Sequence, residues 1–103
     1  MFAPNEDQWR KDCKKAAEVI RKDGWVQKRS IGPNNEHCLM NAVQHATGYW
    51  IVSGQANRDR YNAVRERIKA KLGIRYPAVW NDAQDRTKEE VLDLLEDLAV
   101  EFA

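Results

Sequence analysis

One stretch of the sequence decides the fold: Thr87-Lys88-Glu89-Glu90-Val91-Leu92-Asp93-Leu94-Leu95-Glu96-Asp97-Leu98. Its first four residues match a capping box, in which the Thr87 hydroxyl accepts from the amide of Glu90 and the Glu90 carboxylate accepts from the amide of Thr87. The apolar residues that follow recur at helical spacing: Val91, Leu92, Leu94, Leu95, Leu98, Ala99 and Phe102. This is the widest apolar face in the chain, and it predicts a C-terminal core helix.

Three more helices are predicted upstream of this stretch. The residues from about 58 to 72 place Tyr61, Val64, Ile68 and Leu72 on one side, with Asn57 as the expected cap and Gly73 as the stop. A helix from near Asn35 to Gly48 has Leu39, Ala42, Val43 and Ala46 on its apolar face and His37, Asn41, Gln44 and His45 on its polar stripe.

The first helix is expected over residues 5–23, with Asn5 as the N-cap and Gln8 completing a variant capping box. Trp9, Cys13, Ala16, Ala17 and Ile20 recur on one face of it. Gly24 is expected in the left-handed conformation that ends the helix, with Trp25 over Ile20 as in a Schellman motif.

The connecting segments are rich in aromatic residues. Residues 74–80 are predicted to be extended, because the residue before Pro77 avoids the helical conformation. Trp25-Val26-Gln27 also reads as extended, and Tyr49-Trp50-Ile51-Val52 fits either a short strand or a buried connector. The predicted fold is therefore an all-α, four-helix domain over residues 1–103 with short extended connectors, with or without a minor two-stranded patch.

Composition limits the classes of protein to which the chain can belong. It has 103 residues, 43% of them hydrophobic and 32% charged, as expected of one soluble globular domain. The N-terminus has no basic and apolar pattern of a signal peptide, and no apolar run approaches the roughly 20 residues that span a bilayer. Two cysteines, Cys13 and Cys38, form no disulfide framework, so a cytoplasmic protein with free thiols and no membrane association is expected.

Charge is segregated along the chain although the net charge is only +1. Residues 49–75 carry a net +5 and residues 76–103 a net −6. The basic residues of the helix at 58–72 are the candidates for contacts to nucleic-acid phosphates: Arg58, Arg60, Arg65, Arg67, Lys69 and Lys71. The favoured interpretation is structural, since cations suit a helix C-terminus and the two segments can neutralise each other.

Catalytic chemistry has one candidate, Cys38, expected in the first turn of a helix beside His37. A helix N-terminus lowers the pKa of a thiol, but a base is also needed. His37 projects about 100° away around the helix, His45 lies two turns further on, and the chain has no third histidine. No ligand spacing for a metal is present, and Asp82 and Asp85 read as turn residues. No enzymatic activity, cofactor or metal is expected.

Four elements carry a resemblance to known sequences: Gly24-Trp25-Val26-Gln27, Cys38-Leu39-Met40-Asn41-Ala42, Trp80-Asn81-Asp82 and Thr87-Lys88-Glu89-Glu90-Val91-Leu92. Together they resemble an uncharacterised family of small proteins from actinobacteria and their phages, over most of the chain from about Ala16. The chain departs from the family at Asn41, where a small residue is usual, and at Lys28, where glycine is frequent.

The family has no established activity, so the resemblance transfers no catalytic residue. It implies a bacterial or phage accessory protein that acts in the cytoplasm by binding a host or cellular protein. The predicted function is thus a non-enzymatic protein-interaction module with an unidentified protein partner, with Trp80, Asn81 and Asp82 as an interaction or structural motif. Weak nucleic-acid binding through residues 58–72 is the alternative.

Overall fold

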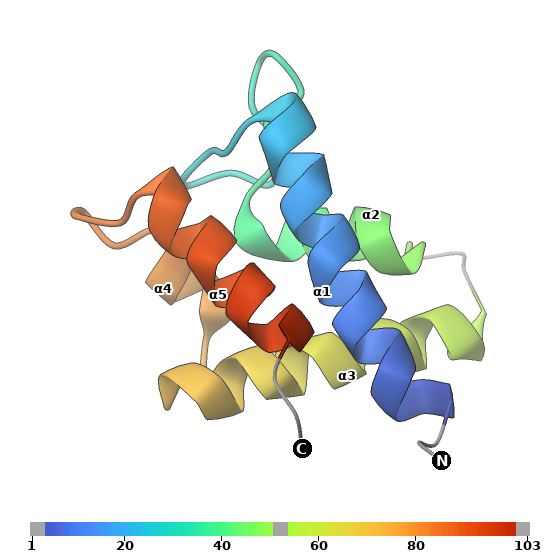
Figure 1. Cartoon of the computed structure of the whole chain (residues 1–103). Helices are drawn as coiled ribbons and strands as arrows, with labels where there is room; N and C mark the ends of the chain where they lie inside the picture. The colour runs from blue at the N-terminus through green and yellow to red at the C-terminus, as the bar shows by residue number, and fades with distance from the viewer. Residues whose placement is uncertain (1–3, 51–53, 101–103) are drawn as a thin grey trace.

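The capping box at Thr87 forms as the sequence predicts. In the computed structural model (Figure 1), which describes residues 4–50 and 54–100, the Glu90 amide donates to Thr87 Oγ1 at 3.2 Å and the Thr87 amide donates to Glu90 Oε1 at 3.0 Å. The hydrogen bond from the Thr87 amide is the largest cause that holds the pKa of the Glu90 carboxyl below its usual value, and Arg86 adds to it. The helix that follows, α5, spans Lys88–Val100. Phe102, assigned to its apolar face, lies outside the described residues.

Four helices precede α5 and confirm an all-α fold. They are α1 (Pro4–Asp23), α2 (Leu39–Thr47), α3 (Gln55–Leu72) and α4 (Pro77–Asn81). Gly24 and Gly73 end α1 and α3 with φ of 97° and 65°, values that glycine adopts without steric cost. The Gly24 amide donates to the Ile20 carbonyl at 2.8 Å, which is the αL form of helix ending and not the Schellman form that was expected.

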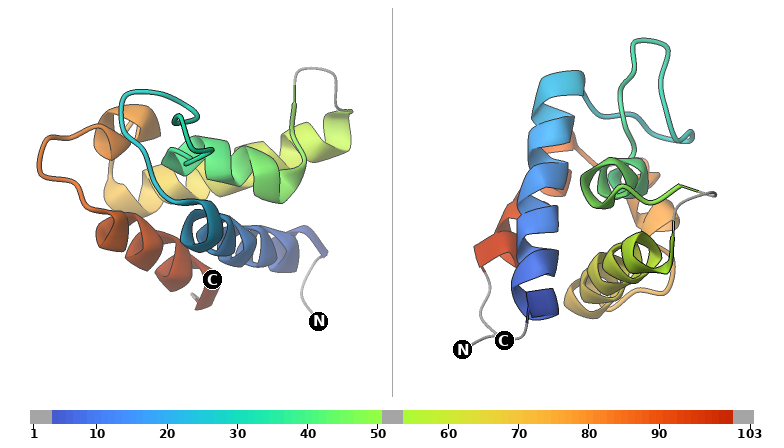
Figure 2. Two further views of the ribbon diagram at one scale, coloured as in Figure 1. Left: turned by 90° about the horizontal axis from the view of Figure 1, so that it is seen from above. Right: turned by 90° about the vertical axis from the view of Figure 1, so that its right-hand side faces the viewer.

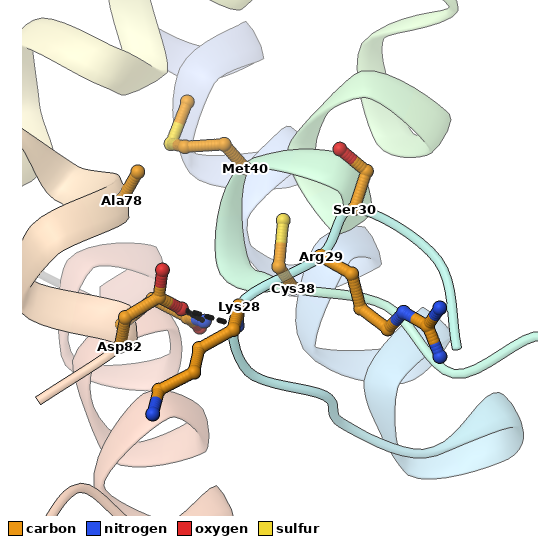
Figure 3. A pocket seen from close by; sticks show the side chains of 8 residues that line it. Lys28, Arg29, Ser30, Cys38, Met40, Ala78 and Asp82 are labelled. Carbon is orange, nitrogen blue, oxygen red and sulfur yellow. Dashed lines mark hydrogen bonds between the residues drawn. The ribbon is translucent and has the colours of Figure 1, made fainter. Parts of the chain in front are cut away.

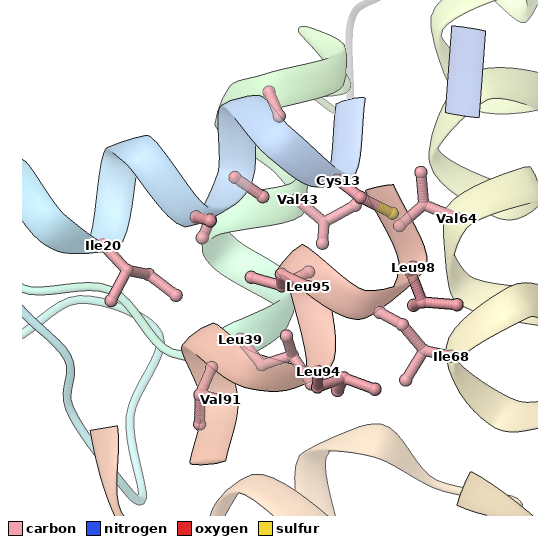
Figure 4. Packing of buried hydrophobic residues seen from close by; sticks show 14 of the residues in the cluster. Cys13, Ile20, Leu39, Val43, Val64, Ile68, Val91, Leu94, Leu95 and Leu98 are labelled. Atoms are coloured by element: carbon pink, nitrogen blue, oxygen red, sulfur yellow. The ribbon is translucent and has the colours of Figure 1, made fainter. Parts of the chain in front are cut away.

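The helices bury one apolar core, and α1 contributes more than the sequence suggested. Figure 2 shows α1 lying between α5 on one side and α2 and α3 on the other, and it contacts all three. The core side chains come from these four helices (Figure 4): Trp9, Cys13, Ala16, Ala17, Ile20, Leu39, Ala42, Val43, Ala46, Val64, Ile68, Val91, Leu94, Leu95 and Leu98. The C-terminal helix is buried along its apolar face as predicted, but the central helix is α1.

Three predicted helix starts are displaced. The helix at α1 begins at Pro4, and the side chain of its expected cap, Asn5, is outside the described part. The helix at α3 begins after Gly54, and Asn57, the expected cap, lies inside it and donates to the Gly48 carbonyl at 3.2 Å. The helix at α2 begins at Leu39, four residues after the predicted start, because Asn35 is left-handed, with a φ of 66°, and Cys38 is extended, with a ψ of 169°.

The prediction of an extended segment at residues 74–80 is wrong. Tyr76, before the proline, is extended as expected, but Pro77 then starts α4. Proline suits the first helical position, where the missing N–H would have had no partner and φ is already correct. The connector therefore contains a fifth helix.

The segment between α1 and α2 runs extended without forming a regular strand. Isolated bridges join Trp25 to His37 and Ile31 to His37, which is all of the predicted two-stranded patch that the described residues contain. Tyr49 and Trp50 are in no strand, and Ile51 and Val52 lie outside the described residues. Backbone hydrogen bonds within the 24–38 segment join Val26 to His37 and His37 to Gly24, at 3.1 and 3.0 Å, and side chains from elsewhere add to them.

Candidate protein-interaction surface around α4

Asn81, the last residue of α4, holds three parts of the chain together. Its side chain is buried, with 1% of its surface exposed. The carboxamide oxygen accepts from the Trp25 indole N–H at 2.7 Å and from the Leu39 amide at 3.0 Å. The carboxamide nitrogen donates to the Val26 carbonyl at 3.2 Å. One side chain thus fastens α4 to the 24–38 segment and also satisfies the first amide of α2.

Gln27 and Asp82 complete this contact. The Gln27 side-chain nitrogen donates to the carbonyls of Asn81 at 3.0 Å and Ala83 at 2.7 Å. Asp82 Oδ1 accepts from the Lys28 amide at 2.7 Å. We call this set of hydrogen bonds, centred on Asn81, the Asn81 clamp. It brings together the Gly24–Gln27 and Trp80–Asp82 elements, and it supports the structural interpretation of Asn81 and Asp82.

Lys28, whose amide takes part in the clamp, has an unfavourable backbone conformation. Its φ is 65°, a left-handed value that costs a non-glycine residue about 1–2 kcal/mol. The side chains of Lys28 and its neighbour Arg29 are exposed and have no partner among the described residues. Two unpaired cations therefore lie beside the clamp.

A cavity of about 200 Å³ opens next to these cations (Figure 3). Its lining comes from the 24–38 segment, the start of α2 and one side of α4: Lys28, Arg29, Ser30, Cys38, Met40, Ala78, Asn81 and Asp82. Met40 and Ala78 contribute apolar lining, and the charged side chains of the lining are Lys28, Arg29 and Asp82. We call this hollow the basic flank of α4.

Cys38 lies in this flank as the N-cap of α2, not in the first turn as predicted. Its sulfur accepts from the Asn41 amide at 3.3 Å. Burial, the largest cause, raises the pKa of the Cys38 thiol, the negative charge of Asp82 adds to this, and the hydrogen bonds from Asn41 and Met40 oppose it. A protonated thiol is a poor nucleophile.

His37 does not serve Cys38 as a base, although the two are adjacent in sequence. The prediction placed His37 and Asn41 on an exposed polar stripe, yet both are buried. His37 Nδ1 lies 2.6 Å from Asn41 Oδ1, and its Nε2 lies 2.8 Å from Asp23 Oδ2. The hydrogen bond from His37 is the main reason why the pKa of Asp23 is lowered. Both ring nitrogens are thus used to join α1 to α2.

His45 packs against the same imidazole. The centroids of the two rings are 4.6 Å apart, which is closer than two residues separated by two turns of one helix would lie. His37 precedes α2, so its ring is not held at a helical position. Burial and the neighbouring His37 lower the pKa of His45. Within residues 4–50 and 54–100, no three histidine, cysteine or acidic side chains converge to hold a metal ion.

The six basic residues proposed for nucleic-acid contact do not form a free cationic row. Arg60 makes a paired contact with buried Asp12 of α1, at 2.6 and 3.1 Å. The Arg67 guanidinium lies 4.8 Å from the Trp9 ring centre. Arg65 and Lys69 both lie against Glu66 of the same helix, at 3.6 and 3.0 Å. Arg58 and Lys71 are exposed, and Lys71 has a partner as well.

The exposed surface of α4 was not anticipated. Val79 of α4 exposes 68% of its surface, and Tyr76, the extended N-cap residue of the same helix, exposes 59%. We call these two residues the α4 ridge. An extended 74–80 segment would have alternated them between two faces. The pattern of proline at the first helical position was the available indication of this helix.

On the other side of the ridge, Trp80 borders a second hollow of about 330 Å³. The remaining lining comes from the end of α3, the 82–87 loop and α5: Lys71, Leu72, Arg86, Glu90, Asp93, Leu94 and Asp97. Arg86 lies over Trp80, 3.9 Å from the ring centre, and pairs with Glu90 at 2.9 Å. Asp93 and Asp97 are exposed and have no partner in the described part of the chain. We call this hollow the acidic flank of α4.

The architecture is that of a small all-α protein in which the Asn81 clamp joins the irregular 24–38 segment to the short, exposed helix α4. No helix in the described ranges has the length and hydropathy needed to cross a membrane. The chain belongs to a family of unknown function, DUF6197, whose model matches residues 5–101. No curated protein and no solved structure matches it.

Proposed function

We propose that this protein is a non-enzymatic protein-interaction module whose contact surface is the α4 ridge with its two flanks. The observation that carries the proposal is the exposure of Val79 on α4 and of Tyr76 at its start, on a helix whose last residue is hydrogen-bonded to Trp25 and Leu39. Aromatic side chains, tyrosine among them, are enriched where proteins bind one another. A fixed helix loses little conformational entropy when it binds.

The biological setting is part of the same proposal. The resemblance to small proteins of actinobacteria and their phages suggests an accessory protein that works in the cytoplasm on a host or cellular protein. Cys38, with its raised pKa and with His37 turned to Asp23, gives no support to thiol catalysis. The engagement of Arg60 and Arg67 by Asp12 and Trp9 makes nucleic acid the less favoured partner.

The experiment compares captured proteins between variants of a tagged chain in actinobacterial lysate. Tyr76→Ser with Val79→Ser should lose a protein that the wild type retains. Val100→Ser is the matched control, because Val100 is as exposed as Val79, at 70%, but lies on α5. The same protein should still bind Arg65→Glu with Lys69→Glu. Capture that is unchanged by the ridge variant, or abolished by the α3 variant, would contradict the proposal.

A further inference from the structure

The two flanks of α4 carry opposite charge. The charged side chains of the basic flank are Lys28, Arg29 and Asp82, which sum to +1. Those of the acidic flank are Lys71, Arg86, Glu90, Asp93 and Asp97, which sum to −1. The charged side chains that have no partner within residues 4–50 and 54–100 sharpen the contrast, since they are Lys28 and Arg29 on one flank and Asp93 and Asp97 on the other.

The ridge lies between these flanks on the helix surface. Successive residues of a helix are turned by about 100°, so Ala78 and Trp80 point to opposite sides of Val79. Ala78 lines the basic flank and Trp80 the acidic flank. Across the helix, the surface therefore consists of the basic flank, the apolar α4 ridge and the acidic flank, in that order.

We propose that this surface binds a second copy of the chain through a two-fold axis that runs along α4. Rotation about an axis in that direction places the basic flank of each copy opposite the acidic flank of the other, and the ridges against one another. A two-fold axis perpendicular to α4 would instead place the basic flank of one copy opposite the basic flank of the other, and the two acidic flanks opposite each other. Charge complementarity thus selects the partner and also the orientation, with the two α4 helices parallel.

This arrangement has a specific consequence for residues close to the axis. Side chains near a two-fold axis meet their own symmetry mates, so Val79 of one copy lies against Val79 of the other. Lys28 and Arg29 then face Asp93 and Asp97 twice in each dimer. The inference rests on the proposed function of the α4 ridge as a protein-binding surface, and it makes a second copy of the chain the occupant of that surface in place of a host or cellular protein.

The first test is charge reversal, read by sedimentation equilibrium at protein concentrations up to about 1 mM. Lys28→Glu with Arg29→Glu should weaken dimerisation about tenfold or more, and so should Asp93→Lys with Asp97→Lys, because four exposed contacts per dimer change sign. An equimolar mixture of the two variants should recover heterodimers. The control is Lys14→Glu with Lys15→Glu on α1, which should leave the dissociation constant unchanged.

The second test does not depend on the folding of those variants. Val79→Cys should form an intermolecular disulfide under mild oxidation, whereas Val100→Cys, equally exposed on α5, should remain monomeric. A wild-type chain that is monomeric at about 1 mM, a mixture that fails to recover, or equal cross-linking at positions 79 and 100 would overturn the inference. Capture of another protein that needs Val79, by a chain that stays monomeric, would leave the proposed function standing and remove only the second copy as its partner.

Discussion

Asn81 shows how much one buried amide can hold. Its carboxamide is shared by the Trp25 indole, the Leu39 amide and the Val26 carbonyl, which belong to different parts of the chain. Buried polar groups cost free energy when their partners are removed, about 1–3 kcal/mol for each group. The contribution of Asn81 to stability therefore lies mainly in what its loss would leave unpaired.

We expect Asn81→Ala to lower the free energy of unfolding by about 3 kcal/mol or more, because it leaves two donors and one acceptor without partners. Urea denaturation followed by tryptophan fluorescence measures this. Asn57→Ala is the matched control, since Asn57 makes one hydrogen bond, to Gly48, and should cost less than about 1 kcal/mol. Equal losses for the two variants would show that the clamp does not stabilise the fold.

The left-handed backbone at Lys28 supports a second prediction at this scale. Lys28→Gly and Lys28→Ala remove the same charge, but only glycine adopts a φ of 65° without steric cost. The glycine variant should be more stable than the alanine variant by about 1 kcal/mol. Parallel thermal melts provide the comparison, and an alanine variant at least as stable as the glycine variant would contradict it.

At the scale of elements, local patterns predicted what local interactions determine. The Thr87 capping box and the left-handed glycine after α1 follow from residues a few positions apart, and both are present. The start of α2 could not be predicted from residues close to it in sequence. Cysteine is not a preferred N-cap, and the Leu39 amide is satisfied by Asn81, 42 residues away.

The candidate site was harder to predict than the helices because it depends on contacts between distant segments. Trp80, Asn81 and Asp82 were singled out as a motif, but nothing near them in sequence indicates Gln27 or Trp25 as their partners. The burial of His37 likewise depends on Asp23, at the far end of a loop. The exposed ridge was missed for a different reason, since Pro77 was interpreted as a helix breaker and not as a first helical residue.

The burial pattern of α5 gives a prediction for that element. Leu95 is fully buried against the core, while Leu92 on the same helix is half-buried. Leu95→Ala should cost about 2–5 kcal/mol of unfolding free energy through lost burial and the cavity that remains. Leu92→Ala should cost distinctly less in the same urea titration. An unchanged midpoint for Leu95→Ala would place the core elsewhere.

For the molecule as a whole, the stability should fall with acid in two windows. The pKa of His45 is lowered from 6.5, so the unfolded chain binds a proton more readily and stability decreases as the pH falls below about 6.5. The pKa of Asp23 is lowered from 3.8, so its stabilising contribution is present above that pH and is lost as the pH falls through the folded-state pKa.

Melting temperatures between pH 8 and pH 3 test this prediction. His45→Gln should abolish the upper decline and leave the lower one, because glutamine does not titrate. Asp23→Asn should reduce the lower decline. A wild-type melting temperature that is constant between pH 7.5 and pH 5 would contradict the assignment of the upper window to His45.

Nucleic-acid binding is also a property of the whole molecule, since it depends on the sum of its charges. With a net charge of +1 and several α3 cations engaged by the protein itself, we expect no duplex binding tighter than about 10 μM at physiological salt. Fluorescence anisotropy with labelled duplex and single-stranded probes measures it. Sub-micromolar binding that weakens steeply with salt and disappears in Arg65→Glu with Lys69→Glu would reverse the ranking of the two partner classes.

The Asn81 clamp also has a consequence for the order in which the chain becomes structured during synthesis. Its hydrogen bonds join residues 42 to 56 positions apart. The 24–38 segment leaves the ribosome long before Asn81. The entropy cost of closing the loop between them is not offset by hydrogen bonds until α4 has formed. A nascent chain that has reached only α3 therefore lacks the clamp's hydrogen bonds to this segment and leaves it more accessible to proteases and chaperones. Protection there begins once residues 81–83 have emerged and bound.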